Sequence, residues 1–160
     1  MAKLARWQIW LLILSGGALW LTGTIWLLLH YFGQLKGEFG PETNPFEPWM
    51  LRVHGFAMIA SVVGIGSLLA AHIAKGWQYR RQRLIGIFLL TLVGLLILTG
   101  YLLYYVGDDE QRWLISVVHW SVGLLLPTIF ITHYRQGRSI RRAVFSRQDS
   151  RAVSPVGSSD

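Results

Sequence analysis

Four long apolar runs divide the chain and leave little sequence between them. They cover residues 7–32, 49–74, 84–106 and 113–134. Each reaches the roughly 20 residues that a helix needs to cross the hydrocarbon core of a bilayer. Because lipid offers no partner for backbone polar groups, runs of this length must be helices. The sequence therefore predicts an all-α integral membrane protein, built as an up-down-up-down four-helix bundle.

Charge is distributed unevenly between the two ends of the predicted bundle. One end carries the basic residues Lys3, Arg6, Lys75, Arg80, Arg81 and Arg83 and the arginines from Arg135 onward. The other end carries only three basic residues, Lys36, Arg52 and Arg112, beside the acidic residues Glu38, Glu42, Glu47, Asp108, Asp109 and Glu110. By the positive-inside rule, both termini are cytoplasmic and the acidic loops face outward. The net charge of +7 then reflects topology and contact with lipid headgroups rather than nucleic-acid binding.

Composition also indicates the extent of the membrane domain and limits which residues can bind a cofactor. Residues 1–145 form the predicted membrane domain, and the polar tail 146–160 is expected to be disordered. A multi-pass protein of this charge pattern is expected in a bacterial inner membrane. The chain has no cysteine, which excludes disulfides, thiolate metal sites and cysteine-ligated iron–sulfur clusters. Any redox cofactor must therefore have other ligands.

Two of the predicted helices each carry a histidine near both ends. These pairs are His54 and His72 in the second helix and His119 and His133 in the fourth. A step of 14 residues is close to four helical turns, about 21 Å, and a step of 18 residues is five turns, about 27 Å. Each pair therefore lies on one face of its helix. Ionisable side chains within a bilayer are costly and usually functional.

A weak internal repeat accompanies the histidines. Leu21-Thr22-Gly23 in the first predicted helix matches Leu98-Thr99-Gly100 in the third, and a helix with paired histidines follows each. A duplicated helical hairpin explains this pattern, with the second and fourth helices facing each other across the bundle. Haem iron, ligated from both sides, is the leading candidate to lie between facing imidazoles. Arg52 and Arg135 lie near the two histidine levels and are candidates to pair with haem propionates, or equally with lipid headgroups.

These motifs resemble the bacterial di-haem cytochrome b family. The family includes membrane subunits of formate dehydrogenases and nickel–iron hydrogenases and free-standing quinol-linked cytochromes b. The likeness spans residues 7–135 and rests on the four helices, the histidine pairs and the two Leu-Thr-Gly motifs. It implies two b-type haems with bis-histidine ligation and electron transfer through the membrane, with quinone or quinol as a candidate substrate.

The assignment of ligands is less symmetric than the pattern suggests. His72 and His133 form the predicted inner pair, and His119 is the predicted outer ligand. The second helix has a histidine step four residues longer than the fourth, which displaces one ligand by about 6 Å along the helix axis. His54 is the first candidate to complete the outer pair. His30, near the end of the first predicted helix, is the alternative outer ligand.

The resemblance and the architecture together imply an electron-transfer protein, or a subunit of an oxidoreductase complex, rather than a stand-alone enzyme. A separate redox protein, such as a periplasmic cytochrome c or a dehydrogenase subunit, is expected at the acidic outer loops, and an oligomer is compatible with the sequence. Two other functions remain open. The histidines could line a path for metal ions or protons, or the chain could be a membrane anchor or assembly subunit without haem.

Overall fold

The computed structural model describes residues 5–69 and 83–153, and for residues 83 and 137–153 it describes the backbone alone. Its elements are α1 (Arg6–Phe32), β1 (Leu35–Gly37), β2 (Gly40–Glu42), α2 (Glu47–Leu68), α4 (Arg83–Tyr105) and α5 (Asp109–Val153). Within these described residues, four helical segments are long and apolar enough to cross a membrane, the last being Asp109–Gln136 within α5. The predicted all-α class with four candidate spans is thereby confirmed.

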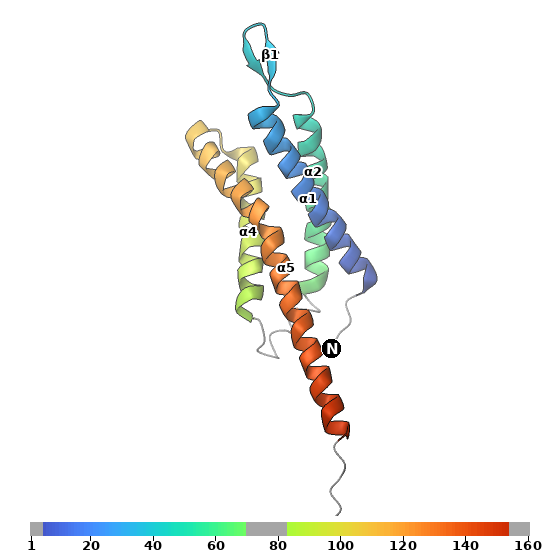
Figure 1. Cartoon of the computed structure of the whole chain (residues 1–160). Helices are drawn as coiled ribbons and strands as arrows, with labels where there is room; N and C mark the ends of the chain where they lie inside the picture. Colours follow the sequence, from blue (N-terminus) through green and yellow to red (C-terminus); the bar gives the residue numbers. More distant parts are fainter. Residues whose placement is uncertain (1–4, 70–82, 154–160) are drawn as a thin grey trace, which may run out of the picture.

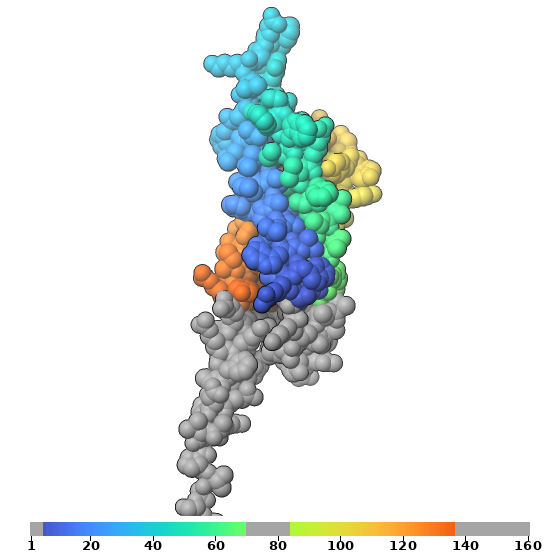
Figure 2. All heavy atoms as spheres, turned by 90° about the vertical axis from the view of Figure 1, so that its right-hand side faces the viewer, coloured from blue at the N-terminus to red at the C-terminus, as the bar shows by residue number. Residues whose placement is uncertain are grey.

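The helices are arranged as two helical hairpins (Figure 1). α1 lies against α2, and α4 lies against α5, while α1 also contacts α5. The short antiparallel β1–β2 hairpin connects α1 to α2 and projects beyond their ends, away from the N-terminus. In Figure 2, α1 and α2 form most of the face in view, and the β-hairpin stands clear of the helices. The sequence analysis treated residues 35–42 only as part of a loop.

Local chemistry explains where two of the helices begin. Pro48 lies in the first turn of α2, where its missing N–H removes no helical hydrogen bond. At the start of α5, the side chain of Asp108 accepts a hydrogen bond of 2.9 Å from the backbone N–H of Gln111. This contact satisfies one of the donors that a helix N-terminus leaves unpaired. Both helices consequently begin a few residues before the apolar runs.

The last helix is longer than its membrane-spanning part. α5 is continuous through Pro127 and past Tyr134, and it ends at Val153. It therefore includes most of the polar segment from Ser146 that composition suggested to be disordered; residues 154–160 lie outside the described residues. Arginine, glutamine and alanine are good helix formers, and no proline occurs between Pro127 and Pro155. Polarity excluded this segment from the bilayer but not from a helix.

Polar and small residues occupy the buried positions. Among the described residues, Ala57 is the buried hydrophobic side chain, whereas the buried polar ones are Ser15, Thr22, Glu47, Ser61 and Thr99. Large apolar side chains such as Leu14, Phe56 and Leu125 are exposed by more than 60%. Soluble domains show the opposite distribution. Small and polar residues between helices, with apolar residues outside, are typical of helices packed within lipid.

A ladder of four polar contacts joins α1 to α2. In order along α1, the contacts are Gln8–Ser67 at 3.2 Å, Ser15–Ser61 at 2.8 Å, Thr22–His54 at 3.0 Å and His30–Glu47 at 3.1 Å. The partners on α1 recur about every two turns, so they share one face. Those on α2 run in the reverse order, which makes the two helices antiparallel. Gly64 lets the helices approach closely, because a Cβ at this position would lie 3.1 Å from a methyl carbon of Leu12.

We expect the Ser15–Ser61 contact to contribute modestly to stability. Interhelical hydrogen bonds within membranes have coupling energies that average about 0.6 kcal/mol. A double-mutant cycle of Ser15→Ala and Ser61→Ala, measured as the free energy of unfolding in detergent, should give a coupling of about this size. The control cycle pairs Ser15→Ala with Ser116→Ala, near the opposite end of the bundle on α5. Equal couplings in both cycles would contradict the hydrogen bond.

Candidate functional site

In the first helical hairpin, two adjacent residues of the Leu-Thr-Gly motif on α1 contact the ring of His54 on α2. The hydroxyl of Thr22 is 3.0 Å from Nδ1 of His54. The next residue, Gly23, faces the same ring, and a Cβ there would lie 3.3 Å from Cε1 of His54. Threonine therefore orients the imidazole, and glycine leaves room for it. The contact lies in the middle of the polar ladder.

The second helical hairpin repeats this arrangement. The hydroxyl of Thr99 on α4 is 2.9 Å from Nδ1 of His119 on α5. A Cβ at Gly100 would lie 3.3 Å from Cε1 of His119. The two Leu-Thr-Gly motifs therefore make matching contacts with a histidine of the following helix. The repeat in the sequence thus corresponds to a repeated contact in the structure.

The two histidines meet where the helical hairpins face each other. The ring centroids of His54 and His119 are 6.3 Å apart, and the ring planes are inclined at 64°. Both residues are partly buried. The second and fourth predicted helices were expected to face each other across the bundle. The structure brings His54 of α2 and His119 of α5 together.

The separation of the rings suits a metal ion between them. A bond from an imidazole nitrogen to a metal is about 2.0–2.1 Å, and a ring nitrogen lies about 1 Å from the ring centre. Two imidazoles on opposite sides of one metal ion therefore have centroids roughly 6–6.5 Å apart. The observed 6.3 Å falls in this interval. The distance between the ring centroids is thus compatible with one metal ion held by both imidazoles.

The set of donors distinguishes among metals. No group of three or more histidine, cysteine, aspartate or glutamate side chains suited to a metal ion occurs within the part of the chain that the structure describes. Zinc and similar ions generally take three or four protein ligands. Haem iron needs only axial ligands from the protein, because the porphyrin occupies its other positions. Two facing imidazoles therefore fit haem better than a bare ion.

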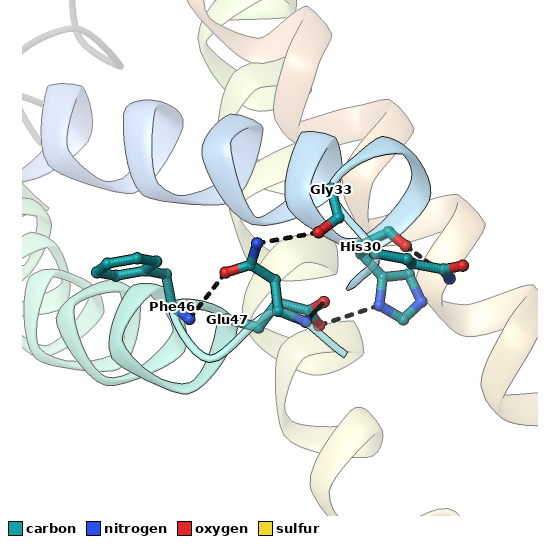
Figure 3. Close-up of polar contacts among 6 residues, drawn as sticks. His30, Gly33, Phe46 and Glu47 are labelled. Carbon is teal, nitrogen blue, oxygen red and sulfur yellow. Dashed lines mark hydrogen bonds and ion pairs between the residues drawn. The ribbon is translucent and has the colours of Figure 1, made fainter. Parts of the chain in front are cut away.

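His30 lies in a different environment, near the end of α1 that leads into the β1–β2 hairpin (Figure 3). Its Nδ1 is 3.1 Å from a carboxylate oxygen of Glu47, and its ring stacks on Trp26 with centroids 4.6 Å apart. Glu47 is buried and also accepts a hydrogen bond from the backbone N–H of Asn44. His30 is eight residues, or about 12 Å, farther along α1 than Thr22. The structure therefore brings His54, and not His30, to His119.

The other predicted site residues are less fully placed. His72 lies within residues 70–82, outside the described residues, so its pairing with His133 stays a prediction. His133 is partly buried on α5, 14 residues after His119. The guanidinium of Arg52 lies 4.7 Å from the ring centre of Trp49, and the side chain is exposed. Arg135 is also exposed, near the end of the apolar part of α5.

Thr22 and Thr99 are the site residues that the sequence analysis did not identify. Their motifs were recognised as a repeat, but no contact with histidine was assigned to either threonine. The signal was the recurrence of threonine and glycine before each helix that carries paired histidines. When a polar residue recurs at the same position of two apolar helices, each copy is expected to contact the same kind of partner.

Comparisons with known proteins add no assignment. No family model matches this chain, and neither a curated protein nor a solved structure matches it.

Proposed function

We propose that this protein is a di-haem membrane cytochrome b that transfers electrons across the bilayer, or between the quinone pool and a partner protein. The observation that carries the proposal is the His54–His119 pair, with ring centroids 6.3 Å apart. These two residues would hold the outer haem. When bound, haem iron supplies one-electron oxidation and reduction.

The surroundings of the pair support the same function. Thr22 and Thr99 hold the two rings from helices on either side, and Gly23 and Gly100 leave space beside them. The two threonines and the two histidines come from four helices that are each long and apolar enough to cross a membrane. Burial and hydrogen bonding to the ligands are the means by which a protein sets a haem potential. At the His54–His119 pair, both rings are partly buried, and each has a threonine as hydrogen-bonding partner.

The inner haem and the orientation of the bundle belong to the same proposal. His72 and His133 would hold the second haem, toward the opposite side of the membrane. Both termini would be cytoplasmic, because the basic residues at that end of the chain follow the positive-inside rule. One haem toward each face would give electrons a path through the bilayer.

The outer end of the bundle is proposed to meet a redox partner. Glu38 and Glu42 on the projecting β-hairpin are exposed, and so are Asp108, Asp109 and Glu110 at the start of α5. Lys36 and Arg112 lie among these five acidic residues, so the net charge of this group is negative. Net charge of one sign steers the association of an oppositely charged partner and makes it sensitive to salt. The partner would be a periplasmic cytochrome c or a dehydrogenase subunit with a basic face. A quinol in the bilayer would be the alternative electron donor.

Purified protein should show the reduced-minus-oxidised absorbance spectrum of a b-type cytochrome, with two haems per chain. Bis-histidine ligation produces low-spin iron, which electron paramagnetic resonance identifies. The measurement combines this spectrum with haem quantification after extraction. A colourless protein that takes up no added haem would refute the proposal. Stoichiometric binding of zinc or copper in place of haem would favour metal transport by the same histidines.

A further inference from the structure

The hydroxyl groups of Thr22 and Thr99 each have a second partner. Thr22 Oγ1 donates to the carbonyl of Ala18 at 2.6 Å, and Thr99 Oγ1 donates to the carbonyl of Leu95 at 2.7 Å. A hydroxyl has one proton to donate and lone pairs to accept with. Two oxygens 2.6–2.7 Å apart need a proton between them, and a carbonyl can only accept, so the hydroxyl proton lies on the side of the helix backbone. Toward the histidine, the oxygen of each threonine must therefore accept.

The direction of these bonds decides where each imidazole carries its proton. If the threonine oxygen accepts, then Nδ1 of His54 and Nδ1 of His119 must donate, and each carries the hydrogen. In a neutral imidazole, the other nitrogen, Nε2, then keeps its lone pair. The hydrogen bond made by one ring nitrogen thus selects the role of the other.

The backbone beside each threonine agrees with this assignment. The carbonyl of Leu19 lies 3.3 Å from Thr22 Oγ1, and the carbonyl of Leu96 lies 3.3 Å from Thr99 Oγ1. Each hydroxyl therefore has two backbone acceptors on its own helix for its one proton. The lone pairs of the threonine oxygen are left to accept from the imidazole.

We propose that Thr22 and Thr99 are positioning residues that fix His54 and His119 as Nδ1–H tautomers and so reserve Nε2 of both rings for a metal. The tautomer is a property of the chain itself, whereas its use for haem ligation rests on the proposed function. The duplicated threonine gives the two ligands matched orientation and matched partners. Because the acceptor is a neutral hydroxyl and not a carboxylate, it raises the basicity of the ligand only modestly.

The direct test is ¹⁵N nuclear magnetic resonance of histidine side chains in the full chain, prepared without haem in lipid nanodiscs. The Nδ1–H and Nε2–H tautomers have different nitrogen chemical shifts. We expect His54 and His119 to be Nδ1–H in the unmodified protein. An Nε2–H form at both positions would overturn the proposal, and this result requires no variant to fold.

Variants assign the effect to each threonine. Thr22→Val keeps the shape of the side chain but removes the acceptor, so His54 should lose the fixed Nδ1–H form while His119 retains it. Thr99→Val should do the reverse, and Thr22→Ser should restore the unmodified signal. The matched control is Thr24→Val, because Thr24 bonds the carbonyl of Trp20 on the same helix and contacts no histidine in the described hydrogen bonds. Unchanged tautomers in both test variants would contradict the role of threonine.

Haem titration separates this inference from the proposed function. Loss of a hydrogen-bonding partner of a metal ligand typically weakens metal binding by about 10–100-fold. Thr22→Val and Thr99→Val should each weaken binding of the outer haem in this range, whereas Thr24→Val should leave it unchanged. If no haem binds even to the unmodified protein, the proposed function fails, but the tautomers remain measurable. If haem binds and His54 and His119 are Nε2–H in the haem-free chain, only the inference fails.

Discussion

Replacing His119 by alanine should remove one of two haems from the protein and leave the other in place. His119 is the proposed outer ligand from α5, and His54 faces it from α2 at 6.3 Å between ring centroids. Loss of an axial ligand should weaken haem binding by more than the roughly 10–100-fold that loss of a ligand's hydrogen-bonding partner causes. Purified His119→Ala protein should therefore contain one haem per chain, measured by extraction and by the reduced-minus-oxidised spectrum.

Two further variants identify the partner of His119. His54→Ala should remove the same haem, with the same spectral change as His119→Ala. His30→Ala should retain both haems, because His30 contacts Glu47 and stacks on Trp26 at the outer end of the helical hairpin. The opposite pattern, in which His30→Ala loses the outer haem and His54→Ala keeps it, would show that the functional protein uses a different outer pair.

Replacing Gly100 by valine should also remove the outer haem, although it changes no ligand. A Cβ at Gly100 would lie 3.3 Å from Cε1 of His119, so an alanine requires the ring to shift by a few tenths of an ångström. Valine adds two more methyl carbons against the same ring. Overpacking of this kind typically costs about 1–3 kcal/mol, which displacement of the ring would relieve. We expect little loss of haem in Gly100→Ala and near-complete loss of the outer haem in Gly100→Val.

The chain offers close controls for this effect. A Cβ at Gly94, on the same helix, or at Gly17, on α1, would meet no atom within 4 Å. Gly94→Val and Gly17→Val introduce the same β-branched residue into a helix and so carry the same change in helix propensity. Both should retain two haems per chain. Gly23→Val should behave like Gly100→Val, because Gly23 occupies the equivalent place beside His54. Equal haem loss in control and test variants would indicate general destabilisation.

Much of the fold could be predicted because membrane helices leave a strong signal in local sequence. The start of α1 was predicted to within one residue, and both Pro48 and Asp108 marked the beginnings of later helices. Length and apolarity suffice for this, since a bilayer accepts few alternatives to a helix. The β-hairpin and the extension of α5 to Val153 were not predicted. Neither depends on a bilayer, so hydropathy carried no information about them.

The candidate site was predictable only in part. Helical periodicity placed the histidines of each helix on one face, and the repeat suggested that the two helical hairpins correspond. Periodicity cannot place residues of different helices relative to each other, because it contains no information on how the helices rotate or shift when they pack. The structure places His54 beside His119 and His30 beside Glu47. Which of the two completes the outer pair stays a prediction. The pairing of His72 with His133 stays a prediction.

By itself, the sequence determined that this chain has four helices suited to a membrane and that two of them carry costly histidines on single faces. Hydropathy and helical periodicity are properties of contiguous sequence, so no tertiary contact is needed to derive them. Only the tertiary structure decided which histidines meet and what orients them. Thr22 and Thr99 reach His54 and His119 through contacts 32 and 20 residues apart in sequence. Such contacts depend on the register between packed helices, where small and polar residues determine how closely the backbones approach.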